Sequence, residues 1–147
     1  MINRTTDVQL TRKRIIMAAK VGGWGSATRE ELCMKGYDVT RVETYFELLE
    51  LLVQYHFDVA LLTNDTDDRG TWMPETVSVI ERCFPHVSSI VLSTHEDLKT
   101  AVELVERGVD DFISVPFDFD DLYETIDRVA ASKCTVQELH HSMSNRD

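Results

Sequence analysis

The sequence has few cysteines and no long hydrophobic run. Its three cysteines, Cys33, Cys83 and Cys134, lie far apart and show no metal-ligand spacing. Their odd number and the absence of a signal peptide predict reduced thiols and a cytoplasmic location. No apolar stretch approaches the roughly 18–20 residues that a membrane-spanning helix needs, so we expect no membrane association. Internal repeats and low-complexity segments are also absent from the sequence.

Positive charge is scarce as well. The chain has 15 Lys and Arg residues against 26 Asp and Glu residues, which gives a formal net charge of −11. A surface this negative repels phosphate backbones and anionic lipid, which argues against direct nucleic-acid binding by the body of the protein. The one exception is a basic N-terminal arm, residues 1–13, which we interpret as a flexible, solvated segment.

The length and composition indicate a single domain. With 147 residues, 43% of them apolar and 28% charged, the chain can bury a sizeable core as one unit. We expect the domain to cover residues 14–132. Residues 133–147 are polar and are interpreted as a C-terminal tail or the start of a linker.

The most informative stretch is FDVALLTND, residues 57–65. It contains the continuous apolar run Val59–Leu62, preceded by Asp58 and followed by a polar cluster. Such a short apolar run is typical of a strand of a parallel sheet, buried on both faces. Ligands and chemistry lie beyond the carboxyl ends of such strands, and this strand ends at Thr63.

Strand-like and helix-like segments alternate along the rest of the chain. The expected strands cover residues 15–19, 37–42, 57–63, 87–92 and 112–115, and the expected helices cover about 26–35, 45–55, 75–84, 96–107 and 118–132. This alternation predicts an α/β fold with a single doubly wound, five-stranded parallel sheet and helices on both faces.

Capping residues and helical spacing give finer expectations for these helices. Ser26 or Thr28 can cap the first helix, and Gly36 can end it. Asp118 or Asp120 can cap the last. The residues expected to share one face or to point inward are Phe46, Leu49 and Val53 in the second helix, Leu98, Ala101, Val102 and Val105 in the fourth, and Leu122, Ile126 and Val129 in the fifth.

Two blocks of this sequence resemble the receiver domain of two-component response regulators. They are FDVALLTND and SSIVLSTHEDLKTAVELVERGVDDFISVPFDFDDLYETIDRVA, residues 88–130. Gly108–Phe112 resembles the family's "GADDF" turn, and Val115–Phe117 resembles its Lys-Pro-Phe end of the fifth strand. The resemblance covers roughly residues 13–131 and implies a flavodoxin-like strand order, 2-1-3-4-5.

The resemblance also implies where phosphorylation chemistry would lie, and most of it is missing. The phosphoacceptor Asp is replaced by Thr63, and the Lys that pairs with the phosphoryl group by Val115. The acidic pair that holds Mg²⁺ falls on Ala19 and Lys20, or one residue earlier. Only the hydroxyl position survives, as Ser93. The spacing between these positions is kept, at 44, 30 and 22 residues.

These replacements have direct chemical consequences. Acyl-phosphate chemistry needs a carboxylate nucleophile, and Thr63 supplies a neutral hydroxyl with no evident base beside it. Mg²⁺ prefers carboxylate oxygens, whereas position 19 offers none and Lys20 carries a repelling charge. Val115 cannot neutralise developing phosphoryl charge. We therefore expect a pseudo-receiver that has no bound metal, no cofactor and no enzymatic activity.

The expected function is that of a phosphorylation-independent regulatory module that binds a protein partner or an output domain. The resemblance implies that it acts through the face formed by the fourth helix, the fifth strand and the fifth helix, with a homodimer as one outcome. Phe112 holds the family's aromatic switch position. The charged candidates on this face are Glu103, Glu106, Arg107, Asp111, Glu124, Asp127 and Arg128.

The sequence leaves an alternative open, in which the old phosphorylation pocket senses a small anion or nucleotide. A glycine-rich turn before a helix can bind an anion through backbone N–H groups. The candidates are Lys20, Gly22, Gly23 and Gly25, together with Thr63 and Ser93. The plainer interpretation is a flexible turn that replaces the metal loop.

Three further features each have two interpretations. Thr63 could be a kinase target, or it could end a strand with its hydroxyl bonded to nearby backbone. Asp65, Asp67 and Asp68 could gather a divalent ion, although a solvated acidic loop is the safer interpretation. Trp24 and Trp72, both expected in loops, could form an interaction patch or lids over the pocket.

Overall fold

A computed structural model of the chain describes residues 12–94 and 98–144, with the backbone alone described for residues 134–144. Most of the predicted N-terminal arm, residues 1–11, therefore lies outside the described residues. No helix in the described part of the chain combines the length and apolar character needed to cross a membrane.

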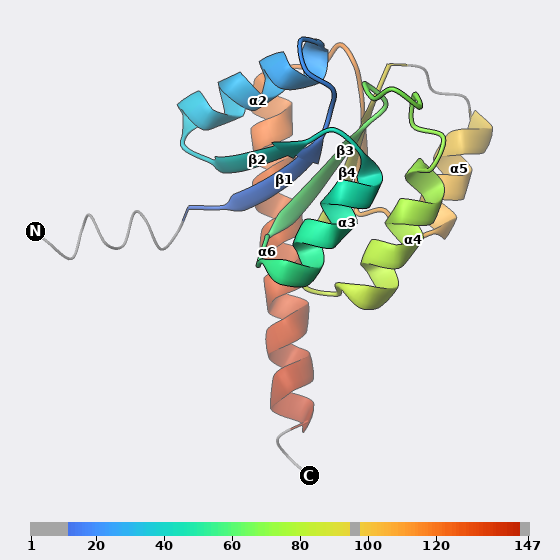
Figure 1. Ribbon diagram of the computed structural model, residues 1–147. Coiled ribbons are helices and arrows are strands. Elements are labelled where there is room, and N and C mark those ends of the chain that lie inside the picture. Colours follow the sequence, from blue (N-terminus) through green and yellow to red (C-terminus); the bar gives the residue numbers. More distant parts are fainter. Residues whose placement is uncertain (1–11, 95–97, 145–147) are drawn as a thin grey trace, which may run out of the picture.

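The core of the protein is one parallel sheet (Figure 1). Its strands are β1 (Arg14–Ala18), β2 (Asp38–Val42), β3 (Val59–Thr63), β4 (Ser88–Ser93) and β5 (Asp111–Ser114). They lie in the order β2-β1-β3-β4-β5, which confirms the predicted topology. β3 is central and all five of its residues are buried, as the continuous apolar run predicts.

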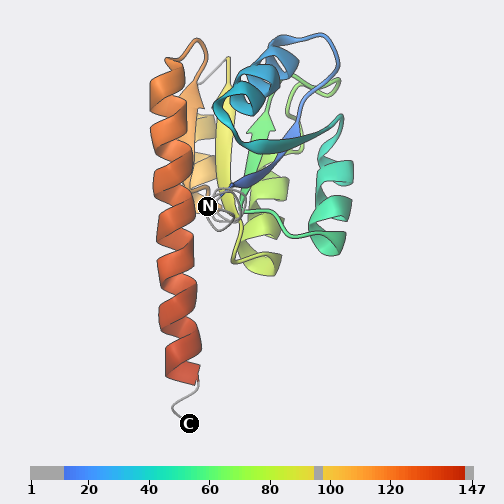
Figure 2. The ribbon, with the colours of Figure 1, turned by 90° about the vertical axis from the view of Figure 1, so that its left-hand side faces the viewer.

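In the described part of the chain, five helices cover the two faces of the sheet (Figures 1 and 2). Helices α2 (Trp24–Lys35) and α6 (Phe119–Ser144) pack on one face, and α3 (Tyr45–Gln54), α4 (Met73–Cys83) and α5 (Leu98–Glu106) pack on the other. Side chains of β1 alternate between the two cores: Ile16 and Ala18 contact the three-helix side, and Ile15 and Met17 contact the α2–α6 side.

The start of α2 differs from the expectation. Its N-cap is Gly23, and Ser26 and Thr28 lie inside the helix. Their hydroxyls donate to backbone carbonyls, Ser26 to Lys20 and Thr28 to Trp24. The prediction that Gly36 ends the helix is confirmed: its φ of 114° is left-handed, a conformation that favours glycine.

The face of α3 that carries Phe46, Leu49 and Val53 is not its most buried side. Tyr45, Leu48 and Leu52 are buried, whereas Phe46 and Val53 are 72% and 74% exposed. Apolar residues occur around more than one side of this helix, so their spacing alone does not decide which side meets the sheet.

The predicted buried side of α5 is wrong. The only buried residue that the structure describes in this helix is Leu104, which packs into the core of the three-helix side. Leu98, Val102 and Val105 were expected inside and are 81%, 46% and 68% exposed. The helix therefore presents an apolar row to its surroundings.

Helix α6 is longer than expected. Leu122, Ile126 and Val129 are buried as predicted, and Asp118 accepts the backbone N–H of Asp120 at 3.0 Å, which confirms Asp118 as a cap. However, the helix does not end near Ser132 but continues to Ser144 and projects beyond the sheet (Figure 2). No glycine or proline interrupts residues 133–144, so nothing in the local sequence stops the helix.

The burial of Leu104, in place of the residues expected inside, gives a stability prediction for α5. Replacing Leu104→Ala removes a fully buried side chain and should lower the free energy of unfolding by about 2–5 kcal/mol. The matched change Val105→Ala, one residue along the same helix, should leave stability almost unchanged. Urea unfolding followed by circular dichroism measures both. A larger loss for Val105→Ala would mean that the helix packs with the face that its sequence suggested.

Candidate functional site

Thr63 lies at the carboxyl end of β3, where the candidate site was expected. Its side chain is completely buried. The hydroxyl donates a hydrogen bond to the carbonyl of Ala18 at 2.7 Å and accepts one from the backbone N–H of Asp65 at 3.2 Å. The hydroxyl thus ties the end of β3 to the end of β1, and its donor is already used within the chain.

The carbonyl of Thr63 is also bonded, from the side of α3. The Tyr45 hydroxyl donates to it at 2.6 Å. Burial, with the nearby negative charge of Asp68 adding to it, raises the pKa of Tyr45 well above its ordinary value. The phenol therefore stays protonated at neutral pH and remains a donor.

Ala19, at the position of a metal-binding acid in the resemblance, is enclosed by the start of α2. It is fully buried, and its N–H donates to the carbonyl of Val42 at 2.9 Å. Gly25 approaches so closely that a Cβ atom on it would overlap the Cβ of Ala19. The start of α2 thus packs directly on Ala19, and this close approach depends on the absence of a Cβ atom at Gly25.

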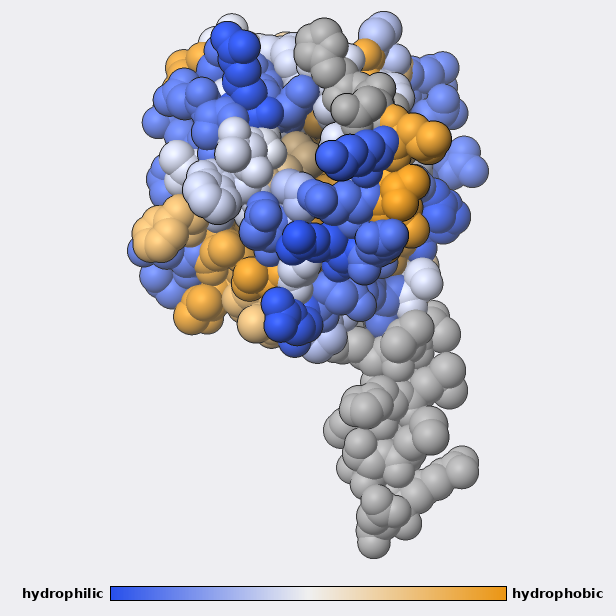
Figure 3. Space-filling model, turned by 90° about the vertical axis from the view of Figure 1, so that its right-hand side faces the viewer, coloured by the Kyte–Doolittle hydropathy of each residue, from blue (hydrophilic) through white to orange (hydrophobic). Residues whose placement is uncertain are grey.

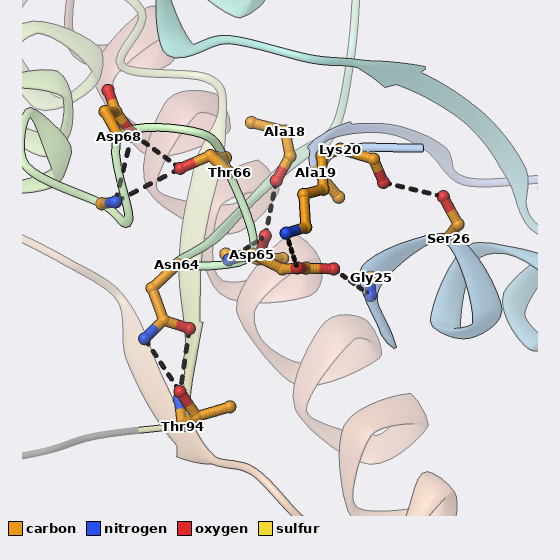
Figure 4. A network of polar contacts seen from close by, with 12 residues as sticks. Ala18, Ala19, Lys20, Gly25, Ser26, Asn64, Asp65, Thr66, Asp68 and Thr94 are labelled. Atoms are coloured by element: carbon orange, nitrogen blue, oxygen red, sulfur yellow. Dashed lines mark hydrogen bonds and ion pairs between the residues drawn. The ribbon is translucent and has the colours of Figure 1, made fainter. Parts of the chain in front are cut away.

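Asp65 is the residue whose role the sequence did not reveal. It is only 8% exposed, so it is not part of a solvated acidic loop. Its Oδ2 accepts the backbone N–H of Gly25 at 2.9 Å, and its Oδ1 lies 4.0 Å from the Lys20 ammonium (Figure 4). A carboxylate is favoured at a helix N-terminus, where free N–H groups and the helix dipole meet it.

The glycine-rich turn is built around this carboxylate. A Cβ atom on Gly23 would overlap the carboxyl group of Asp65, and Gly25 already donates to it. Gly22 has a left-handed φ of 81° and makes the turn. In the alternative interpretation this turn binds an external anion, and the carboxylate of Asp65 already occupies part of that role.

The local charges do not suit Mg²⁺. Lys20 donates its backbone N–H to the carbonyl of Asp65 at 2.8 Å, so the two residues are joined through backbone and side chain. The ammonium of Lys20 would repel a divalent cation beside that carboxylate. In the part of the chain that the structure describes, no three His, Cys, Asp or Glu side chains are grouped to hold a metal.

A cavity of about 610 Å³ opens above this edge of the sheet. Of the positions singled out from the resemblance, Lys20 and Ser93 line it, and the loop after β3 contributes most of the rest. That loop is internally bonded: Asp68 accepts hydrogen bonds from the Thr66 hydroxyl and the Gly70 N–H. Asn64 is bonded to Thr94 through both its amide oxygen and its nitrogen (Figure 4).

Val115 contributes packing instead of charge. It follows β5, packs against the α2–α6 core and donates its N–H to the carbonyl of Ser93 at 2.9 Å. The two tryptophans lie apart: Trp24 is the first residue of α2 and packs on the same core, whereas Trp72 precedes α4 and is 60% exposed. Trp24 was wrongly expected in a loop.

The charged residues predicted for the interaction face are only partly gathered there. Arg128 of α6 forms an ion pair with Asp111 of β5. Arg107 donates to the Ser78 hydroxyl and so points toward α4, and Asp127 accepts from the Tyr37 hydroxyl on the other side of α6.

The remaining candidates for this face are Phe112 and three glutamates. Phe112 is half-buried and packs against the core of the three-helix side. Glu106 and Glu124 are exposed, and Glu103 is half-buried.

The close packing of Gly23 on Asp65 can be tested by a double-mutant cycle. Gly23→Ala should lower the free energy of unfolding by about 1–3 kcal/mol, because the added methyl meets a buried carboxyl group. In a protein that already carries Asp65→Ala, the same change should cost clearly less. Chemical unfolding of the four proteins gives the coupling energy. Equal costs in both backgrounds would contradict the contact.

The chain matches known proteins along most of its length. A model of the response regulator receiver domain matches residues 25–127. The transcriptional regulatory protein ZraR of Escherichia coli (strain K12) is 26% identical over 118 residues, which is 79% of this chain and 23% of ZraR. The chain thus spans about a quarter of the length of this curated relative.

Solved structures share the fold at lower identity. The CheY-like receiver domain protein from Methanospirillum hungatei JF-1 superposes with a TM-score of 0.75 at 22% identity, covering 85% of this chain and 98% of that one. NtrX from Brucella abortus, crystallised in complex with ADP, gives 0.75 at 18% identity, covering 89% of this chain and 29% of NtrX. With 103 of its 147 residues matched by the family model, the chain belongs to the response regulator receiver domain family.

Proposed function

We propose that this receiver domain regulates by protein–protein interaction and does so without phosphorylation. The observation that carries the proposal is the state of Thr63. A threonine stands where the family places its phosphoacceptor, and its hydroxyl is fully buried and hydrogen-bonded to the carbonyl of Ala18. A neutral, buried and already bonded hydroxyl is a poor nucleophile toward a phosphodonor.

The surroundings of Thr63 support the same conclusion. The start of α2 fills the space beside Ala19, and the Lys20–Asp65 pair occupies the region where a metal would add positive charge. Val115 supplies no counter-charge for a phosphoryl group. Nucleophile, metal and counter-charge are thus replaced together, which also supports a non-catalytic role for the domain.

The face that we propose for the interaction is made by α5, β5 and α6. Leu98, Val102 and Val105 form an exposed apolar row along α5. The Asp111–Arg128 ion pair lies on β5 and α6 of the same face. Exposed apolar side chains beside charged ones are typical of protein interfaces. The partner would be an output domain, a separate regulator or a second copy of the chain.

A small anionic ligand remains the second candidate, and the cavity of about 610 Å³ favours it. Lys20 and Arg69 line this cavity, whereas the N–H of Gly25 is already bonded to Asp65. A ligand would therefore bind through these two cations and the loop hydroxyls instead of the glycine turn. Thermal shifts with phosphate and nucleotides would support this candidate if Lys20→Ala abolished them.

Exposure to a phosphodonor tests the first part of the proposal. Incubation with acetyl phosphate and Mg²⁺ should leave the intact mass unchanged, because no carboxylate stands at position 63. The four-fold variant Ala19→Asp, Lys20→Asp, Thr63→Asp, Val115→Lys serves as the comparison, provided that circular dichroism shows that it folds. A gain of one phosphate by the unaltered protein, on Asp65 or any other carboxylate, would refute phosphorylation-independence.

Charge substitution on α5 tests the interaction face. Val105→Asp places a charge in the apolar row and should abolish most partner capture from the native host, or dissociate a dimer seen by light scattering. Met34→Asp is the matched control, because Met34 is an equally apolar residue, 81% exposed, on α2. If both variants keep the partner, or both lose it, the α5–β5–α6 face is not the site.

A further inference from the structure

A second apolar surface lies on the side of α4 that faces α3, away from α5. It forms a groove between α3 and α4. Its volume is about 610 Å³. The residues that line it are Thr44, Tyr45, Phe46, Leu49, Asp68, Trp72, Glu75, Thr76 and Val79. The groove contains none of the residues of the α5–β5–α6 face, so it is a separate feature.

The groove exposes aromatic side chains that the domain core does not use. Phe46 is 72% exposed and Trp72 is 60% exposed, and Val53 continues the apolar side of α3 at 74% exposed. Helix α3 already buries Tyr45, Leu48 and Leu52 against the sheet, so these other residues are a second apolar side. Figure 3 shows the apolar side chains of this view gathered in two places with polar surface between them.

The charged side chains that line the groove have one sign. Among the described residues that line it, the two charged ones, Asp68 and Glu75, are both acidic. Glu50 is exposed one turn along from Phe46, and α3 has no basic residue. A second copy of this chain, with a net charge of −11, would bring like charges to this rim.

We propose that the α3–α4 groove binds an amphipathic, basic helix of a partner protein. Such a helix would place apolar residues at i, i+3 or i+4 and i+7 against Phe46, Leu49 and Trp72, and Lys or Arg residues beside Asp68 and Glu75. A groove between two helices accepts a third helix by the ordinary packing of side-chain ridges. Aromatic residues in such a groove supply most of the binding energy.

One residue, Tyr45, links the groove to the degenerate phosphorylation site. Tyr45 lines it and donates its hydroxyl to the carbonyl of Thr63 at 2.6 Å. A helix seated in the groove would therefore rest on the residue that holds the end of β3.

A model helix tests the groove directly. The probe is a dye-labelled Leu/Lys peptide of about five turns, roughly 18 residues, with its leucines on one face. A peptide of the same composition with a scrambled order, and hence the same charge, is the control. Fluorescence anisotropy should show binding of the amphipathic peptide at least about tenfold tighter than that of the scrambled one.

Two variants of the protein separate the groove from simple charge attraction. Phe46→Asp should weaken binding by about tenfold or more, whereas Met34→Asp, which adds the same charge to an exposed apolar position of α2, should not. If attraction to the acidic surface were the whole effect, both would strengthen binding. Trp72→Ala gives a second, uncharged test of the groove, and circular dichroism checks that each variant folds.

Three results would overturn the proposal. They are equal binding of the two peptides, unchanged or tighter binding by Phe46→Asp, and a dimer of the unaltered protein that Phe46→Asp dissociates. The last would assign the groove to a second copy. None of them depends on how the α5–β5–α6 face behaves in its own test.

Discussion

The carboxylate of Asp65 joins three parts of the protein at the edge of the sheet. It accepts the Gly25 N–H at the start of α2, lies beside the ammonium of Lys20 after β1, and belongs to the loop that follows β3. A carboxylate that is 8% exposed is stable in such a place because a helix N-terminus and a cation both favour its negative charge. The close approach of Gly23 and Gly25 is possible because neither has a Cβ atom to fill the space.

This arrangement changes what the edge of the sheet can do. Receivers are expected to keep an open acidic site there, and this chain has an internal pair of opposite charges and a buried threonine instead. Our proposals therefore move function to the helix surfaces. The apolar row on α5 and the groove between α3 and α4 lie on opposite sides of α4 and offer two distinct places for protein contacts.

Much of the fold was predictable from local patterns, and each error has a physical cause. Apolar runs located β1, β3 and β4, because strands buried on both faces need them, and alternation located β2. The prediction of the buried side failed for α5, which carries apolar residues on two sides and buries Leu104 instead of Val105. The face that meets the sheet depends on neighbours far away in the sequence. The extension of α6 beyond Ser132 was missed because the polar composition of residues 133–147 was interpreted as the end of the helix.

The sequence by itself determined the parallel sheet, its strand order through the family resemblance, and the chemical identity of the residues at positions 19, 63 and 115. These depend on residue type and short-range periodicity. Only the tertiary structure decided that Asp65 turns inward to meet Gly25, 40 residues away along the chain, and that the Thr63 hydroxyl is bonded to Ala18. A carboxylate in a polar loop has the same local sequence whether water or a helix N-terminus satisfies it, so its role appears only when the chain is folded.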